Sequence, residues 1–392
     1  MIFLALIYLA FISLGLPDSL LGSLWPVMNQ ELSVPVGNAG YISMIVSAGT
    51  IISSLFSHRL IIRFGTGKVT VVSVAFTAAA LLGFSLSPSY LWLLACAVPL
   101  GLGAGAVDSG LNEFVAEHYE AKHMNWLHCF WGVGAMLGPV LVSMLIQWGN
   151  SWRSGYFSIS ILQFALVALL LFSLPMWKKY DRNVENLTKA EQTRKEKSGL
   201  LTPLRSKGAI VAMLTFFLYT SIEATMILWG ASYLVKIKSI LPENAAGWVS
   251  LYFLGITAGR MLSGFISIKL NNEALIRIGT ILILSGVILM LLPLPDLFTV
   301  GAFVIIGLGL APIYPSLLHQ TPVYFGKHNA QATMGLQMAF AYTGTTLMPP
   351  LFGLLFAHAS FSLMPYVLLI CSILLLVFTI RLTVIAKRIE NR

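Results

Sequence analysis

The sequence predicts an all-α membrane protein with twelve transmembrane helices, arranged as two six-helix halves. Of its 392 residues, 57% are hydrophobic and only 10% are charged, and the mean hydropathy is +0.84. A soluble domain carries roughly 25% charged residues, so a soluble fold does not fit. Because a membrane span needs about 20 apolar residues, a chain of this length holds about twelve spans and no sizeable soluble domain.

The apolar stretches follow one another with a single long polar interruption. In the first half they lie at about residues 2–27, 39–61, 69–87, 91–116, 125–149 and 152–177. The first is too long for a signal-peptide core, so we expect a retained span. In the second half they lie at about 208–236, 245–268, 273–292, 297–318, 329–357 and 362–386. We therefore expect one bundle at 1–177, a basic cytoplasmic linker at 178–207 and a second bundle at 208–392.

The basic residues are distributed unevenly between the two sides of the membrane. An even number of spans puts both termini on one side, and that side holds 20 of the 24 Lys and Arg residues, nine of them in the linker. The opposite side holds only Arg153, Lys236 and Lys238. The positive-inside rule then predicts a cell-membrane protein with cytoplasmic termini, as in a bacterial inner membrane. This distribution also explains the net charge of +9 without a nucleic-acid partner.

No motif of an enzyme or of a cofactor site is present in the sequence. Cys96, Cys129 and Cys371 lie singly in apolar stretches, without disulfide or metal-ligand spacing. The segment Gly65-Thr-Gly67-Lys68 lacks the spacing of a phosphate-binding loop. We therefore expect no enzymatic activity, no cofactor and no metal, and any concentrative transport must use an ion gradient.

The two halves resemble each other in sequence. A shift of 207 positions aligns Tyr41-Ile-Ser with Trp248-Val-Ser, and Thr50 with Thr257. Parallel repeats of this kind are typical of transporters whose substrate site lies between the halves, near the midplane of the membrane.

A short loop between the second and third stretches adds a family resemblance. Arg63, Gly65 and Lys68 fit the loop motif Gly-x-x-x-Asp-Arg-x-Gly-Arg-Lys, although its Asp is missing. With the repeat, the chain is similar to the major facilitator superfamily over essentially its whole length. The resemblance implies two six-helix bundles that work by alternating access, with Arg63 near a gate that lacks its usual acidic partner.

Charged residues inside the first-half stretches are the first functional candidates, because a charge at mid-bilayer costs at least about 2.5–3.5 kcal/mol. Asp18 follows Leu16-Pro17, and the proline loosens the helical hydrogen-bond ladder. We expect Asp18 either to carry a proton or accept a hydrogen bond from substrate, or to lie near the outer interface. Asp108 and Asn112 are four residues apart and share a helix face. A carboxylate in an apolar cavity can exchange a proton near neutral pH, and the amide beside it suits a hydroxylated ligand.

Three further first-half residues are weaker candidates. Glu113 points away from the face of Asp108, so we expect a gate or interface residue. His128 and Trp131 are three apart on one face of the next stretch. His128 either hydrogen-bonds a neighbour or binds substrate or relays a proton. Trp131 either packs against lipid or forms an apolar platform for a sugar ring.

In the second half, Glu223 and Arg260 are the strong charges deep within the stretches. We expect them to pair, either as a structural contact or as one that a proton breaks during transport. Additional candidates for substrate contact are Trp229, Gln337 and Tyr342.

Two branches of the superfamily are suggested by short motifs. Asp108-Ser-Gly-Leu-Asn112, followed by Leu127-His128-x-x-Trp131-Gly-x-Gly, resembles the fucose:proton symporter branch. This implies a transporter of a sugar or similar small polar metabolite, coupled to protons through Asp18 and Asp108. We further expect Glu223 to take part in coupling and the protein to be a monomer.

Gly134-Ala-Met-Leu-Gly138-Pro139 instead resembles the Gly-x-x-x-Gly-Pro motif of proton-coupled drug antiporters. Its alternative interpretation is close helix packing with a proline kink. We prefer the symporter.

Overall fold

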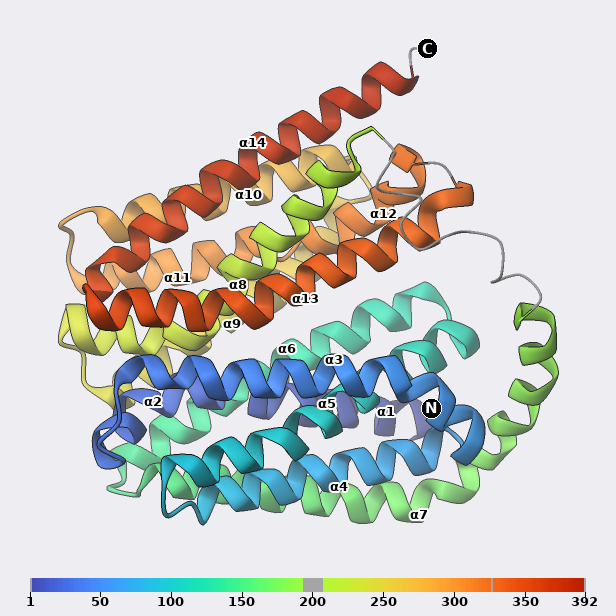
Figure 1. Ribbon diagram of the computed structural model, residues 1–392, viewed down its shortest axis with the longest axis horizontal. Coiled ribbons are helices and arrows are strands. Elements are labelled where there is room, and N and C mark those ends of the chain that lie inside the picture. Colours follow the sequence, from blue (N-terminus) through green and yellow to red (C-terminus); the bar gives the residue numbers. More distant parts are fainter. Residues whose placement is uncertain (1, 193–206, 326, 391–392) are drawn as a thin grey trace. The chain divides into compact units, whose positions relative to one another are not determined.

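A computed structural model describes residues 2–192, 207–325 and 327–390. Within these ranges, twelve helical segments are long and apolar enough to cross a membrane, and they are numbered here as spans 1–12 in chain order. This confirms the predicted fold class. The chain divides into two compact units (Figure 1).

The first unit comprises Met1–Lys197 and Leu241–Ser250. Span 1 consists of two helices separated at Ser19, and span 2 begins with a short 3-10 turn. Figure 1 shows α3, α4 and α5 side by side. The helices are α1 (Ile2–Asp18), α2 (Leu20–Glu31), η1 (Val36–Asn38), α3 (Ala39–Phe64), α4 (Thr66–Ser85), α5 (Tyr90–His118), α6 (Ala121–Gln147) and α7 (Trp152–Gln192).

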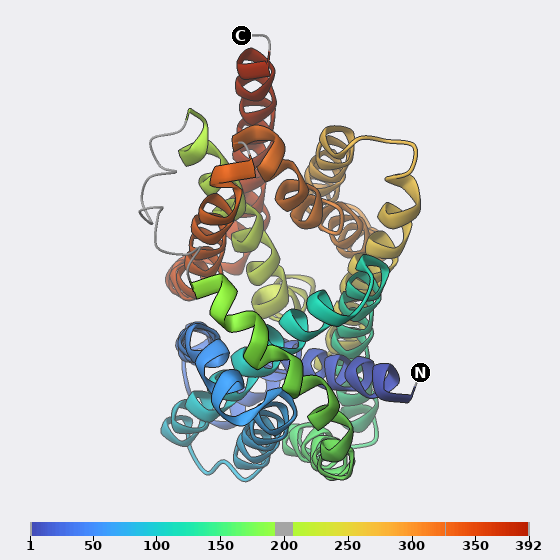
Figure 2. The same cartoon turned by 90° about the vertical axis from the view of Figure 1, so that its right-hand side faces the viewer.

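The second unit comprises Ser198–Ile240 and Leu251–Arg392. Span 10 consists of two helices, α11 and α12, and α8 packs against both α13 and α14 (Figure 2). The helices are α8 (Ala209–Lys238), α9 (Pro242–Ile266), α10 (Asn272–Leu291), α11 (Asp296–Leu310), α12 (Ile313–Phe325), α13 (Lys327–His358), η4 (Phe361–Leu363) and α14 (Met364–Glu390).

Helix α7 is longer than the sequence pattern predicts. The apolar stretch ends at about residue 177, but the helix continues to Gln192. Residues 178–192 contain neither glycine nor proline, and many of them are strong helix formers. The first part of the predicted linker is therefore helical, and most of the remainder lies outside the described residues.

The two units use the same pairs of neighbouring helices. Span 1 packs against spans 5 and 6, and span 3 against spans 4 and 6. In the second unit, span 7 packs against spans 11 and 12, and span 9 against spans 10 and 12. Each pair recurs six spans later, as expected for the internal repeat that the two halves of the sequence indicate.

Small residues allow several of these helices to touch through their backbones. A methyl group on Gly101 or Gly105 of α5 would overlap the carbonyl oxygen of Val46 or Thr50 in α3. In the second unit, a methyl group on Gly255 of α9 would overlap the carbonyl oxygen of Val304 in α11. Such contacts are a common means of association between membrane helices.

Three hydroxyl groups of α3 donate hydrogen bonds to backbone carbonyls of α5. Thr50 Oγ1 donates to Gly101 O at 3.3 Å, Ser53 Oγ to Leu102 O at 2.5 Å and Ser54 Oγ to Gly105 O at 3.1 Å. Polar groups of this kind act as directional contacts between membrane helices. They fix both the rotation and the axial register of α3 against α5.

Gly65 makes the turn between α3 and α4. Its backbone angles are φ 84° and ψ 151°, a combination that only glycine adopts without strain. The glycine shared with the family loop motif is thus required by the backbone conformation between spans 2 and 3.

Candidate functional site

Asp18 lies halfway along span 1, which extends from Phe3 to Glu31. The sequence pattern ended this stretch near residue 27 and left open a position at the outer interface. The helical span continues to Glu31, so residue 18 lies nearer its middle than the apolar stretch indicated. The Asp18 side chain is exposed, and its Oδ2 accepts a hydrogen bond from Trp131 Nε1 in α6 at 2.8 Å.

Close packing of α1 on α6 brings Trp131 to Asp18. A methyl group on Gly15 of α1 would overlap the carbonyl oxygen of Trp131, and one on Gly134 of α6 would overlap that of Ile12. The indole N–H is thereby directed to a carboxylate, which neither interpretation of Trp131 from the sequence anticipated.

Asp108 and Asn112 lie on one face of α5, as their spacing predicts. Asn112 Nδ2 donates a hydrogen bond to Asp108 Oδ1 at 2.9 Å, and both side chains are half-buried. The Oδ1 atom of Asn112 is buried and, among the described residues, has no hydrogen-bond partner. Buried acceptors are usually satisfied, so this oxygen is available to a donor from a ligand or a water molecule.

Glu113 points away from this pair and contacts span 2. His58 Nδ1 and Glu113 Oε1 are 2.9 Å apart, and the two side chains are 43% and 36% exposed. His58 lies in the loop-motif region beside Ser57 and is not among the residues that the sequence pattern predicts. The contact joins α3 to α5 in addition to the three hydrogen bonds from Thr50, Ser53 and Ser54.

His128 lies three residues before Trp131 on α6 and is half-buried. Its ring meets the ring of Phe11 in α1 edge to face, with 6.0 Å between the centroids. His128 therefore lies at the same helix contact that brings Trp131 to Asp18.

Glu223 and Arg260 face each other within the second unit. Arg260 Nη2 is 3.9 Å from Glu223 Oε1, and the side chains are 20% and 19% exposed. The same oxygen accepts a hydrogen bond from Tyr219 Oη at 3.1 Å. Tyr219 lies one helical turn before Glu223, a spacing that places both on one face. Tyr219 is not among the predicted site residues, although this spacing is a signal for it in the sequence.

The other second-half candidates occupy different environments. Trp229 is fully buried and donates from Nε1 to Pro349 O at 2.9 Å, while Gln337 is 2% exposed and accepts from Thr321 Oγ1 at 2.9 Å. Tyr342 is half-buried. Trp229 thus links α8 to α13 and Gln337 links α12 to α13, and their roles as substrate contacts stay predictions.

Arg63 is exposed at the end of α3, with its guanidinium carbon 5.2 Å from the centroid of the Phe64 ring.

Among the described residues, His, Cys, Asp and Glu form no group that would hold a metal ion.

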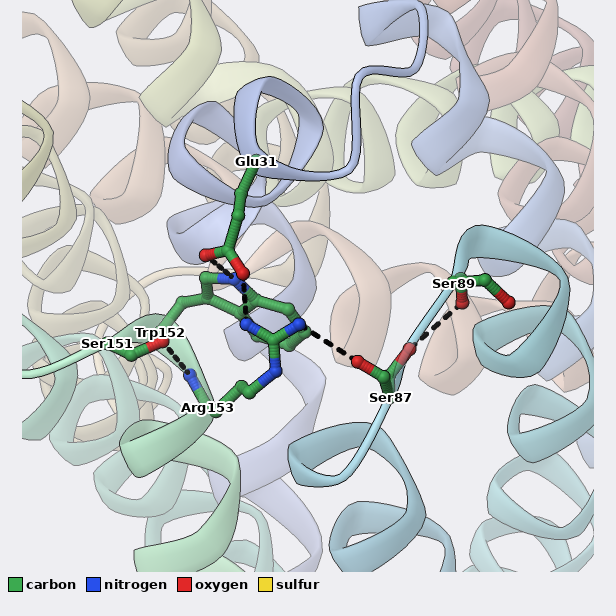
Figure 3. Close-up of polar contacts among 6 residues, drawn as sticks. All are labelled: Glu31, Ser87, Ser89, Ser151, Trp152 and Arg153. Atoms are coloured by element: carbon green, nitrogen blue, oxygen red, sulfur yellow. Dashed lines mark hydrogen bonds and ion pairs between the residues drawn. The ribbon is translucent and has the colours of Figure 1, made fainter.

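A further polar cluster joins the ends of spans 1 and 6 (Figure 3). Arg153 forms an ion pair with Glu31, donates to Ser87 O at 2.9 Å and stacks on Trp152 with 4.3 Å to the ring centroid. Trp152 Nε1 donates to the other oxygen of Glu31 at 2.7 Å. One of the few basic residues on the sparsely charged side is thus neutralised by a carboxylate.

Twelve spans in two similarly built units, with acids inside the spans, define a membrane transporter. The chain belongs to the Major Facilitator Superfamily, whose family model matches residues 7–318 and, in a second match, residues 236–391. The family and its transporter members agree with the expectation that the chain is not an enzyme.

Curated relatives cover most of the chain. Bypass of stop codon protein 6 of Saccharomyces cerevisiae is 25% identical over 411 residues, covering 97% of this chain and 82% of that protein. The glucose/mannose transporter GlcP of Bacillus subtilis is 25% identical over 356 residues, covering 88% and 86%. A crystal structure of the peptide transporter POT aligns with a TM-score of 0.77 at 15% identity, covering 99% of this chain and 95% of that one. The last comparison shows the fold alone.

Proposed function

We propose that this protein is a secondary active transporter that moves a sugar, or a similar small polar metabolite, together with protons by alternating access. The observation that carries the proposal is the contact between Asp108 and Asn112 inside span 4. The similarity to a glucose/mannose transporter over most of the chain supports the substrate class.

The pair has the hydrogen-bonding capacity that a hydroxylated ligand needs. A sugar hydroxyl both donates and accepts, an ionised carboxylate only accepts, and an amide does both. Protonation of Asp108 adds a donor beside the Asn112 oxygen. Proton uptake therefore changes which hydrogen bonds this face of α5 offers to the substrate.

The coupling acids in this proposal are Asp18, Asp108 and Glu223. Each lies inside a span, where an ionised carboxylate is costly and protonation relieves the cost. The substrate contacts are Asn112, His128 and Trp131, with Tyr342 as a weaker candidate. Arg63 and Glu113, at the ends of α3 and α5, belong to the gate.

The proposed location is the cell membrane, with both termini in the cytoplasm. The support is the bias of 20 among 24 basic residues toward the side of the termini.

The packing of α6 argues against drug antiport. A methyl group on Gly134 would overlap the Ile12 carbonyl oxygen, and one on Gly138 would come 2.7 Å from that of Leu16. The Gly-x-x-x-Gly-Pro segment therefore has a sufficient explanation in the contact with α1.

Transport by the purified protein in proteoliposomes tests the proposal. With an imposed inside-alkaline gradient, labelled glucose or mannose is expected to accumulate, and a protonophore is expected to abolish the accumulation. Failure to accumulate any sugar of a screened panel, together with transport of lipophilic cations, would favour the antiporter.

The variant Asp108→Asn tests the coupling role. We expect gradient-driven accumulation to fall by roughly 5- to 150-fold, the range of ordinary coupling free energies, while sugar exchange without a gradient remains measurable. The matched control is Asp296→Asn, which removes an exposed acid at the start of α11 and is expected to leave both rates unchanged. Normal accumulation by Asp108→Asn would contradict the assignment.

A further inference from the structure

Gln163 joins spans 1, 3 and 6 in the interior of the first unit. Its Nε2 donates to Ser13 O in α1 at 2.8 Å, and its Oε1 accepts from Thr77 Oγ1 in α4 at 2.8 Å. Gln163 is 1% exposed, and the two partner residues are similarly buried. A polar amide in this environment is favourable only when both ends are hydrogen-bonded.

Ser13 needs this external donor because of Pro17. In a regular helix the Ser13 carbonyl would accept from the N–H four residues later, but that residue is a proline, which has no N–H and whose ring displaces the same carbonyl. Gln163 replaces the missing hydrogen bond from outside the helix. Prolines in membrane helices are tolerated when neighbouring groups satisfy the released carbonyl in this way.

The Ser13 carbonyl fixes the direction of the Gln163 amide. A carbonyl only accepts, so the amide nitrogen faces Ser13 O and the amide oxygen faces the Thr77 hydroxyl, which also lies 2.9 Å from Val74 O. The position of α1 at its opened turn is therefore determined by α4 and α7 together.

Asp18 directly follows Pro17, so its position depends on this turn. We propose that Gln163 is a positioning residue for Asp18: it holds the proline-opened turn of α1 so that the carboxylate meets Trp131. This inference rests on the proposed coupling role of Asp18. Trp131 of α6 donates to the Asp18 side chain at 2.8 Å, while Gln163 of α7 donates to the backbone of α1 at Ser13 O.

Three variants test the inference in proteoliposomes with labelled glucose. Gln163→Leu removes both hydrogen bonds, Asp18→Asn removes the proposed coupling acid, and Gln30→Leu removes an exposed glutamine of α2 as the matched control. For each variant, gradient-driven accumulation and gradient-free exchange are measured per amount of folded protein.

We expect Gln163→Leu to lower accumulation by roughly two- to tenfold, the range that the single hydrogen bond to Ser13 O supports, and to change exchange much less. A purely structural role would lower both in proportion, and this result would overturn the inference. The inference would also be overturned if Gln163→Leu accumulated glucose as the native protein does while Asp18→Asn did not accumulate it. Native accumulation by Asp18→Asn would instead remove the proposed role of Asp18, and the inference with it.

The double variant Pro17→Ala/Gln163→Leu covers the case in which Gln163→Leu does not fold. The restored N–H can pair with Ser13 O, so the double variant is expected to fold with a regular turn. We expect its accumulation to fall while its exchange persists, because Asp18 is displaced. Native accumulation by the double variant would overturn the inference.

Discussion

Glu223 and Arg260 show how opposite charges are accommodated inside a bundle of apolar helices. Their closest atoms are 3.9 Å apart, too far for a strong hydrogen bond, and Tyr219 provides the hydrogen bond to the carboxylate. Removal of one partner of such a pair leaves a charge with poor solvation, whereas removal of both does not.

We therefore expect Arg260→Gln to destabilise the protein by about 3 kcal/mol, the lower end of the range for breaking a buried pair. The double variant Glu223→Gln/Arg260→Gln is expected to recover most of the thermal stability but not gradient-driven uptake, because Glu223 is a proposed coupling acid. Melting temperature in detergent and uptake in proteoliposomes measure the two effects separately. Recovery of uptake as well would make the pair purely structural.

At the scale of an element, the turn at Gly65 sets the direction in which α4 leaves α3. An added side chain cannot adopt these backbone angles without strain, whatever space surrounds it. The loop motif is therefore explained here by conformation at one position and by charge at its neighbours.

Gly65→Ala is expected to cost about 1–3 kcal/mol, the usual strain of a residue held in a sparsely populated backbone region. The control is Gly264→Ala, because Gly264 lies within α9 and an added methyl group meets no atom within 4 Å. Heating in detergent followed by size-exclusion chromatography gives both melting temperatures. Equal temperatures for Gly65→Ala and the native protein would contradict the assigned backbone conformation.

At the scale of the whole molecule, the uneven basic charge predicts the orientation in the membrane. Lys68, in the first turn of span 3, is expected at the cytoplasmic side, and Asn150, between spans 5 and 6, on the opposite side; both are exposed.

In a background without the three native cysteines, a membrane-impermeant maleimide is expected to label Asn150→Cys in intact cells. Lys68→Cys should react only after permeabilisation, because its side chain faces the cytoplasm in the proposed orientation. The reverse pattern would place the termini outside.

Much of the fold follows from the sequence because apolar length and charge asymmetry are local properties of the chain. The Asp108–Asn112 contact was predictable for the same reason, since i and i+4 spacing alone creates it. The contacts of Asp18 with Trp131 and of Glu113 with His58 depend on how closely two helices approach. That approach is set by glycines whose partners are distant in the sequence. The extension of α7 was missed because the polar residues beyond the apolar stretch were taken as a linker, although they are good helix formers.

The three hydrogen bonds from hydroxyl groups of α3 to carbonyl groups of α5 also have a mechanical consequence. Sliding or rolling of one helix on the other would break three directed hydrogen bonds and force glycine-lined backbones apart. The two helices therefore move as one rigid body, and any movement of Asp108 also moves Gly65 and the loop to α4. The hinges of a transport cycle must then lie outside α3 and α5. A cross-link between these two helices should leave transport intact.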